Sequence, residues 1–430
     1  MAKRTVIANG RVVDPAQGLD EVRSVVLEGE VVKDLLKRPP SKADTLVDAR
    51  GMLVTPGFID LHVHLREPGH EYKEDVASGA MAAVAGGFTT IVSMPNTDPV
   101  NDSPTVTELI LDRARRARLC RVLPAGAVTV GLKGEALAEM GLLAQAGCVI
   151  FTDDGKPVMS ASVMRRALEY AKGLGLAVMV HEEDLTLSKG GAMHEGEHST
   201  TLGLKGIPSA AEDVMVVRDI ALLETTGGHL HVAHLSTEGA ARAVRAAKKR
   251  KLKVTCEVTP HHFSLTDEAV ASYDTSTKMA PPLRASADRK ALLKALRDGT
   301  VDAIATDHAP HSAVEKDLEY PAAANGVVGL ETAAALTLKL VLEGELPLLR
   351  AIELLTSGPA GVLGLETGTL LPGRPADLTI VDLDEAWDVD PKRFYSKSRN
   401  TPFAGWRLQG RVKSTWVAGR KVYQDRGGAA

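Results

Sequence analysis

Eight short apolar runs, separated by segments of helical period, dominate the middle of this 430-residue sequence. Segments such as Ser160 to Gly173 and Ala287 to Asp298 have the spacing of amphipathic helices, and this alternation is typical of βα units around a parallel sheet. Eight such units predict an α/β fold whose strands close into a (β/α)8 barrel. The predicted strands end near His64, Asn96, Val128, Asp154, His181, His234, Pro260 and Asp307.

A doubly wound sheet is the alternative architecture. Nucleotide-binding sheets of that kind carry GxGxxG after the first strand or a GxxxxGK phosphate loop, and the sequence has neither. The sequence therefore favours the barrel. Two polar loops, residues 182–212 and 309–326, follow predicted strands, so we expect both at the barrel face where active sites are built.

The composition argues against several classes of function. Basic and acidic residues number 51 and 55 and are intermixed, so nucleic-acid binding is not indicated. The N-terminus lacks the apolar core of a signal peptide, and no apolar stretch is long enough to span a membrane. Cys120, Cys148 and Cys256 lie far apart, so we expect no disulfide framework. We therefore predict a soluble, cytoplasmic protein.

Histidine and aspartate stand where several of the predicted strands end. His62 and His64 are two residues apart, so both imidazoles point to the same side of a strand. Other runs end in His or Asp in the same way, and neutral imidazoles with carboxylates suit zinc or another borderline metal. We predict a metal site from these strand-end residues, which are His62, His64, Asp154, His181, His234 and Asp307.

Seven motifs extend this pattern along the chain: HVHLREPG, MPNT, FTDDG, VMVHEED, HVAHLST, KMAPPLR and ATDHAPH. In this order they resemble the dihydroorotases of the cyclic amidohydrolase superfamily, class I bacterial type, over essentially the whole chain. The resemblance implies a distorted (β/α)8 TIM barrel at residues 56–365. It also implies a small β-sandwich domain from residues 1–55 and 366–430, which agrees with the short Val and Leu runs at both ends.

The family pattern implies a zinc site of one or two ions. By similarity, His62, His64 and Asp307 hold one zinc, and His181 and His234 hold a second. The alternation of side chains along a strand does not decide whether Asp153 or Asp154 is the bridging group. The family motif favours Asp154. Many relatives bridge with a carboxylated lysine instead, for which Lys156 is the nearby alternative, although it reads as a surface charge.

The reaction implied by the resemblance is the reversible cyclisation of N-carbamoyl-L-aspartate to dihydroorotate in pyrimidine biosynthesis. A zinc-bound hydroxide and Asp307 as general acid and base would act on the ring amide. Arg66 would grip the substrate carboxylate, although it could instead pair with Glu67. The implied substrate-binding residues are His64, Arg66, Asn96, His311, Asn325 and Gly326. The chain departs from the class I pattern at Asn325, where an aromatic is usual, and at Ala280, where Asn is usual.

Two other functions remain open from the sequence. A hydantoinase or allantoinase would share the metal chemistry without needing the carboxylate grip. A noncatalytic dihydroorotase-like subunit could support aspartate transcarbamoylase, although such homologues typically lose metal ligands and every expected ligand is present here. A homodimer and a complex with aspartate transcarbamoylase are the protein partners that the resemblance allows, with no nucleic acid or membrane.

Overall fold

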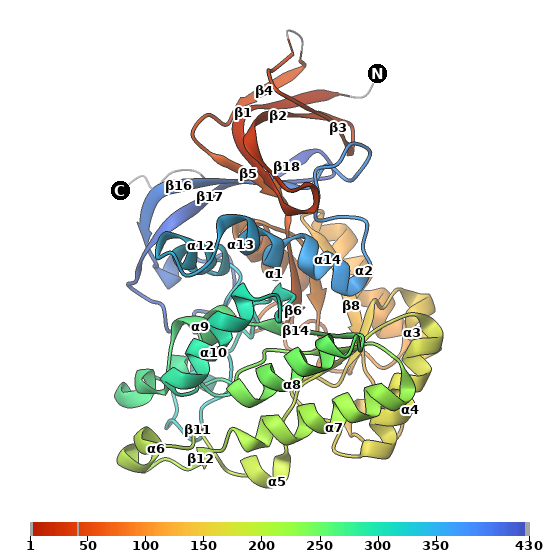
Figure 1. The fold of residues 1–430 in the computed structure, drawn as a ribbon, viewed down its shortest axis with the longest axis vertical. Coiled ribbons are helices and arrows are strands. Elements are labelled where there is room, and N and C mark those ends of the chain that lie inside the picture. Colours follow the sequence, from red (N-terminus) through yellow and green to blue (C-terminus); the bar gives the residue numbers. More distant parts are fainter. Residues whose placement is uncertain (1–2, 41–42, 426–430) are drawn as a thin grey trace.

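The computed structural model describes residues 3–40 and 43–425, and its centre is a parallel sheet of eight strands wound into a barrel. Figure 1 shows this barrel with its helices below a second sheet. Val63 and His308 form a parallel bridge between the two edges, which brings the barrel close to closure. The prediction of a (β/α)8 fold is confirmed. In spatial order the strands are β15 (Ala303–Ile304), β14 (Val254–Val258), β13 (Leu230–Val232), β10 (Val178–Val180), β9 (Ile150–Thr152), β8 (Arg121–Gly126), β7 (Phe88–Ser93) and β6 (Phe58–Val63).

The helices that cover the barrel are amphipathic, and α8 (Glu238–Lys249) shows why they form. The Thr237 side chain accepts a hydrogen bond from the Ala240 amide, buried residues including Val244 and Ala247 follow at helical spacing, and Lys248 lies in the last turn. The helices predicted near 160–173 and 287–298 are confirmed as α4 (Ala161–Leu174) and α10 (Ser286–Arg297). The other helices are α1 (Val76–Ala85), α2 (Pro104–Ala117), α3 (Met140–Ala146), α4 (Ala161–Leu174), α7 (Ala210–Thr226), α10 (Ser286–Arg297), α12 (Ala333–Leu342), α13 (Leu348–Leu355) and α14 (Ser357–Leu363).

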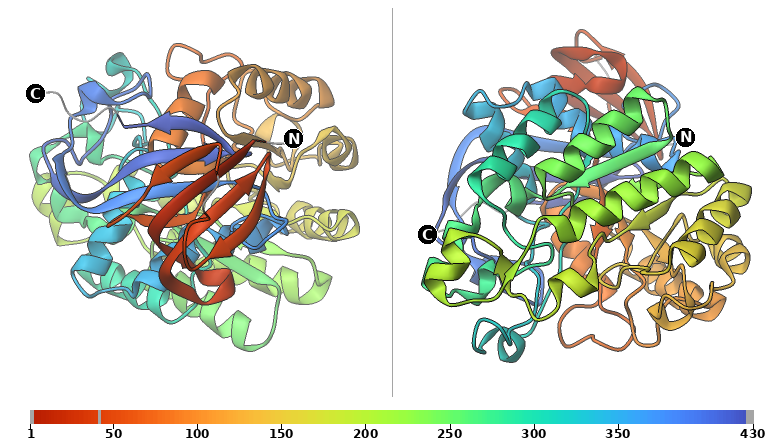
Figure 2. Two further views of the ribbon diagram at one scale, coloured as in Figure 1. Left: turned by 90° about the horizontal axis from the view of Figure 1, so that it is seen from above. Right: turned by 60° about the horizontal axis from the view of Figure 1, so that its bottom comes forward.

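Both ends of the chain contribute strands to the second sheet. Strand β5 (Leu53–Pro56) pairs in parallel with β1 (Arg4–Asp14) on one side and antiparallel with β16 (Leu378–Asp388) on the other, so Thr55 lies opposite Thr379. Figure 2 shows the N-terminal strands in red beside the C-terminal strands in blue. The strands are β1 (Arg4–Asp14), β2 (Leu19–Glu28), β3 (Val31–Leu36), β4 (Thr45–Asp48), β5 (Leu53–Pro56), β16 (Leu378–Asp388), β17 (Arg407–Val417) and β18 (Arg420–Gln424).

The predicted polar loop at 182–212 is a folded excursion rather than an irregular loop. Strands β11 (Met193–His194) and β12 (Gly206–Ile207) pair in parallel within it, flanked by α5 (Leu185–Ser188) and α6 (Glu197–Leu202). Buried Met193 packs there with Val270 and Tyr320, which explains why the excursion is ordered. The remaining short elements are α9 (Pro260–Ser264), α11 (Ala313–Lys316) and 3-10 turns at Pro15–Gln17, Val130–Leu132, Asp267–Ser272, Thr275–Thr277 and Pro391–Arg393.

Among the helices of residues 3–40 and 43–425, none is both long enough and apolar enough to cross a bilayer.

Candidate active site

Asp154 lies at the centre of four histidines at the carboxyl ends of the barrel strands. Its Oδ1 is 3.2 Å from His62 Nε2, 3.5 Å from His234 Nε2 and 3.7 Å from His181 Nδ1, and its Oδ2 is 3.4 Å from His64 Nε2. These five side chains form two groups of potential metal ligands that share Asp154. The residues come from β6 and from the ends of β9, β10 and β13, so the strand ends converge as the sequence predicted.

Asp307 joins this cluster from the end of β15. Its Oδ1 is 3.0 Å from His64 Nε2 and 3.6 Å from His62 Nε2, and it is 6% exposed. Asp307 has φ 46° and His234 has φ 30°, values that cost conformational energy for residues with a Cβ. The surrounding fold therefore holds both side chains toward the cluster against a local backbone preference.

The cluster fits a divalent metal by the chemistry of its donor atoms. His62 Nε2 and Asp154 Oδ1 are buried without a hydrogen-bond partner among the described residues. Nδ1 of His181 and Nε2 of His234 face each other at 2.9 Å. Orphaned buried polar atoms are costly, and imidazole nitrogens with carboxylate oxygens are ligands that zinc accepts.

The charges of the cluster are strongly coupled. Burial would raise the pKa of Asp154, but His62, His181 and His234 hold it well below its ordinary value. Burial would lower the pKa of His62, but Asp154 and Glu257 raise it well above its ordinary value. Asp154 is therefore ionised, which is the state in which a carboxylate can bind a metal.

The structure distinguishes Asp154 from its neighbours Asp153 and Lys156. Asp153 points away from the histidines and accepts hydrogen bonds from the backbone amides of Val128 and Thr129, at 2.8 and 2.9 Å. Lys156 is exposed, in agreement with the expectation of a surface charge. Asp154 is thus the residue of this segment that faces the cluster.

Arg66 is a buried cation beside the cluster. It is 8% exposed and forms no ion pair with any carboxylate of the described residues. Its Nε donates to the Pro310 carbonyl at 3.2 Å, and its Nη2 lies 3.4 Å from His311 Nε2. Glu67, the alternative partner considered from the sequence, pairs with Arg113 instead at 3.0 Å. The alternative prediction that Arg66 pairs with Glu67 is therefore wrong.

The other predicted substrate-binding residues differ in how close they lie to the cluster. Asn96 Oδ1 lies 2.9 Å from His64 Nδ1, next to the cluster. Gly326 has φ 134°, and a Cβ there would approach the Ala309 Cβ to 2.6 Å, so the close packing of this loop requires glycine. Asn325 is exposed, and its side chain has no hydrogen bond within the part of the chain that the structure describes.

Glu257 is a residue of the site that the sequence analysis missed. It is fully buried on β14, with Oε1 2.8 Å from His62 Nδ1. Burial would raise the pKa of Glu257, but hydrogen bonds from His231 and His62 lower it to about 2. The signal in the sequence was a glutamate inside the apolar run VTCEV, where a buried parallel strand has no room for an unpaired charge.

Comparison with known proteins agrees with this geometry. The family described as Dihydro-orotase-like matches residues 51–240, and the family described as Amidohydrolase matches residues 272–423. A dihydroorotase of Anaeromyxobacter dehalogenans is 60% identical to this chain over 97% of the chain and 98% of that relative. The chain belongs to the dihydroorotase family. A second dihydroorotase, from Geobacter metallireducens, is 53% identical over 97% of this chain and 99% of its own length.

Solved structures show the same architecture as this dihydroorotase-family chain. The L-hydantoinase (dihydropyrimidinase) from Arthrobacter aurescens superimposes with a TM-score of 0.89, covering 99% of this chain and 96% of that one. Its sequence identity is 26%, far below that of the dihydroorotases. The barrel with its terminal sheet is therefore shared with hydantoinases, whereas the sequence lies closer to dihydroorotases.

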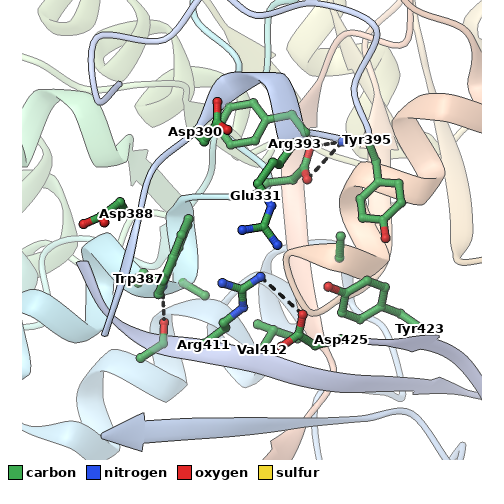
Figure 3. Close-up of a pocket in the computed structure, with 15 residues that line it drawn as sticks. Glu331, Trp387, Asp388, Asp390, Arg393, Tyr395, Arg411, Val412, Tyr423 and Asp425 are labelled. Atoms are coloured by element: carbon green, nitrogen blue, oxygen red, sulfur yellow. Dashed lines mark hydrogen bonds and ion pairs between the residues drawn. The ribbon is translucent and has the colours of Figure 1, made fainter. Parts of the chain in front are cut away.

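A separate cavity of about 270 Å³ lies between α12 and the strands of the terminal sheet (Figure 3). The side chains of Arg393 and Arg411 point into it, and Arg411 stacks on Trp387 at 5.4 Å while also pairing with Asp425. None of its lining residues belongs to the cluster around Asp154. The cavity is therefore distinct from the candidate active site.

Proposed function

We propose that the chain catalyses the dihydroorotase reaction, the reversible cyclisation of N-carbamoyl-L-aspartate to dihydroorotate with release of water. The observation that carries this proposal is Arg66, a buried guanidinium next to the strand-end cluster without a carboxylate partner in the described residues. A buried charge is costly unless an opposite charge meets it. The substrate and the product both carry a carboxylate, and either would meet that charge.

The proposal includes one or two zinc ions. His62, His64 and Asp307 would hold one, His181 and His234 a second, and Asp154 would lie between them. When bound, zinc lowers the pKa of water toward neutrality and polarises a carbonyl oxygen.

The side chains of the chain itself supply binding and proton transfer. Arg66 donates two parallel hydrogen bonds to the substrate carboxylate, and Asn96 and His311 contact the same group. In the hydrolytic direction, Asp307 accepts the proton of the attacking water and delivers it to the ring nitrogen as the amide bond breaks. In the cyclising direction, the same carboxylate takes the proton from the carbamoyl nitrogen as that nitrogen attacks the side-chain carboxyl carbon. It then returns the proton to the carboxyl oxygen, which leaves as water when the C–O bond breaks.

A comparison of substrates tests the proposal. The purified, zinc-loaded chain should hydrolyse dihydroorotate and form it from carbamoyl-aspartate, with a kcat/KM well above that for unsubstituted hydantoin. The alternative enzyme is a hydantoinase, which the structural likeness to L-hydantoinase favours. A clear preference for hydantoin would replace the proposed function with that alternative.

The proposal also covers location and partners. We place the enzyme in the cytoplasm, because its three cysteines are free and buried. Association with a second copy or with aspartate transcarbamoylase stays a prediction. Sedimentation of the purified chain, alone and mixed with that enzyme, would test both.

A further inference from the structure

Glu257 lies inside the barrel between two histidines from different strands. Its Oε1 is 2.8 Å from His62 Nδ1, and its Oε2 is 3.1 Å from His231 Nε2. All three side chains are 0% exposed. A carboxylate accepts hydrogen bonds, so it meets an N–H of both imidazoles.

The hydrogen bonds continue away from the cluster along β13 and β14. His231 Nδ1 lies 2.8 Å from Thr255 Oγ1, which in turn lies 2.9 Å from His229 Nε2. If His231 donates to Glu257 through Nε2, then its Nδ1 accepts from the Thr255 hydroxyl, whose oxygen accepts from His229. When the rings are neutral, this one carboxylate determines which nitrogen of each imidazole in the series carries the proton.

We propose that Glu257 is a positioning residue for the metal site, which holds the proton of His62 on Nδ1 and so directs the lone pair of Nε2 toward Asp154. The inference deepens the metal site of the proposed function and does not depend on the identity of the substrate. His62 has the geometry this requires, because its Nε2 lies 3.2 Å from Asp154 Oδ1 on the opposite side of the ring from Glu257.

The physical consequence concerns metal affinity. Without the carboxylate, the Nδ1–H of His62 has no acceptor and the imidazole can exchange its two tautomers, only one of which presents an unprotonated Nε2. The negative charge of Glu257 also increases the basicity of that nitrogen. Loss of a carboxylate that orients a metal-binding histidine typically weakens metal binding roughly 10- to 100-fold.

Zinc binding tests the inference directly. Competition with a chromophoric chelator should show that Glu257→Leu weakens the binding of zinc roughly 10- to 100-fold. Glu257→Gln keeps an acceptor oxygen for His62 and should lose less than the leucine variant. Asp14→Leu is the control, because Asp14 is a fully buried carboxylate in the terminal sheet, and it should bind zinc as the wild type does.

Nitrogen NMR of the metal-free wild type supplies a second measurement that needs no variant. At a pH high enough for the His62 ring to be neutral, it should appear with Nδ1 protonated and Nε2 unprotonated. Zinc binding by Glu257→Leu within about twofold of the wild type, or a neutral wild-type His62 ring protonated on Nε2, would overturn the inference. If Glu257→Leu does not fold, the tautomer decides, whereas a wild type that binds no zinc refutes the proposed metal site itself.

Discussion

Replacing Arg66 with methionine separates substrate binding from metal binding. Methionine keeps much of the aliphatic volume but removes the guanidinium, and because both residues have a Cβ, the strain at φ 63° is unchanged. One donor of Arg66 is already used on the Pro310 carbonyl, which leaves the Nη groups for the substrate carboxylate. Hydrogen bonds to a charged group contribute about 1.5–3 kcal/mol each, and Asn96 and His311 would retain part of the grip. We therefore expect a net loss of about 2–4 kcal/mol.

That loss corresponds to a fall in kcat/KM on dihydroorotate of roughly 30- to 1000-fold. Steady-state hydrolysis followed in the ultraviolet measures it, and zinc content should equal that of the wild type. Arg113→Met is the matched control, because Arg113 is more exposed and, among the described residues, forms an ion pair with Glu67 alone. The kcat/KM of this variant should stay within about twofold of the wild type. If the kcat/KM of Arg66→Met on dihydroorotate stayed within about threefold of the wild type, the proposed binding of the substrate carboxylate by Arg66 would be refuted.

Three further predictions concern the metal, the proton transfer and the stability. Removing divalent ions with a chelator should abolish turnover and zinc should restore it, whereas full activity of the stripped enzyme would contradict the metal site. Asp307→Asn should lower kcat at least roughly 100-fold, and a change of only a few-fold would assign the proton transfer to another group. Burial raises the pKa of half-buried Glu331 to about 7, so the folded chain holds a proton that the unfolded chain has released. The free energy of unfolding in urea should therefore fall as the pH rises from about 4.5 to about 7 and level off above that, and Glu331→Gln should lose this part of the pH dependence.

Much of the barrel could be predicted because its strands are buried on both faces. Such strands appear in the sequence as continuous runs of apolar residues. The run before His181 is an example, since β10 (Val178–Val180) ends one residue before it. The choice between Asp153 and Asp154 could not be made in this way. Consecutive side chains at a strand end point in different directions. Asp153 is held by the backbone amides of Val128 and Thr129 and by the Thr129 hydroxyl, which come from another strand end.

The partners of buried charges could not be predicted because they are distant in the chain. Glu257 meets His62 across 195 residues, and Arg66 meets the Pro310 carbonyl across 244. The sequence around a single charged residue does not indicate which distant residue will be its partner. Strands β11 and β12 were missed for a related reason, since strands of two residues show no period. Met193 of β11 packs against Val270 and Tyr320, which are distant in the chain.

The pairing of β5 with β16 has a consequence for biosynthesis. Thr55 and Thr379, which meet in that pairing, are 324 residues apart, and a ribosome adds about 5–20 residues per second. Strand β5 therefore leaves the ribosome roughly 16–65 s before its partner exists. During that interval its edge offers unpaired amide and carbonyl groups to any other extended chain. Fragments that end before Leu378 keep this edge permanently open, and we expect them to aggregate where the complete chain remains monodisperse.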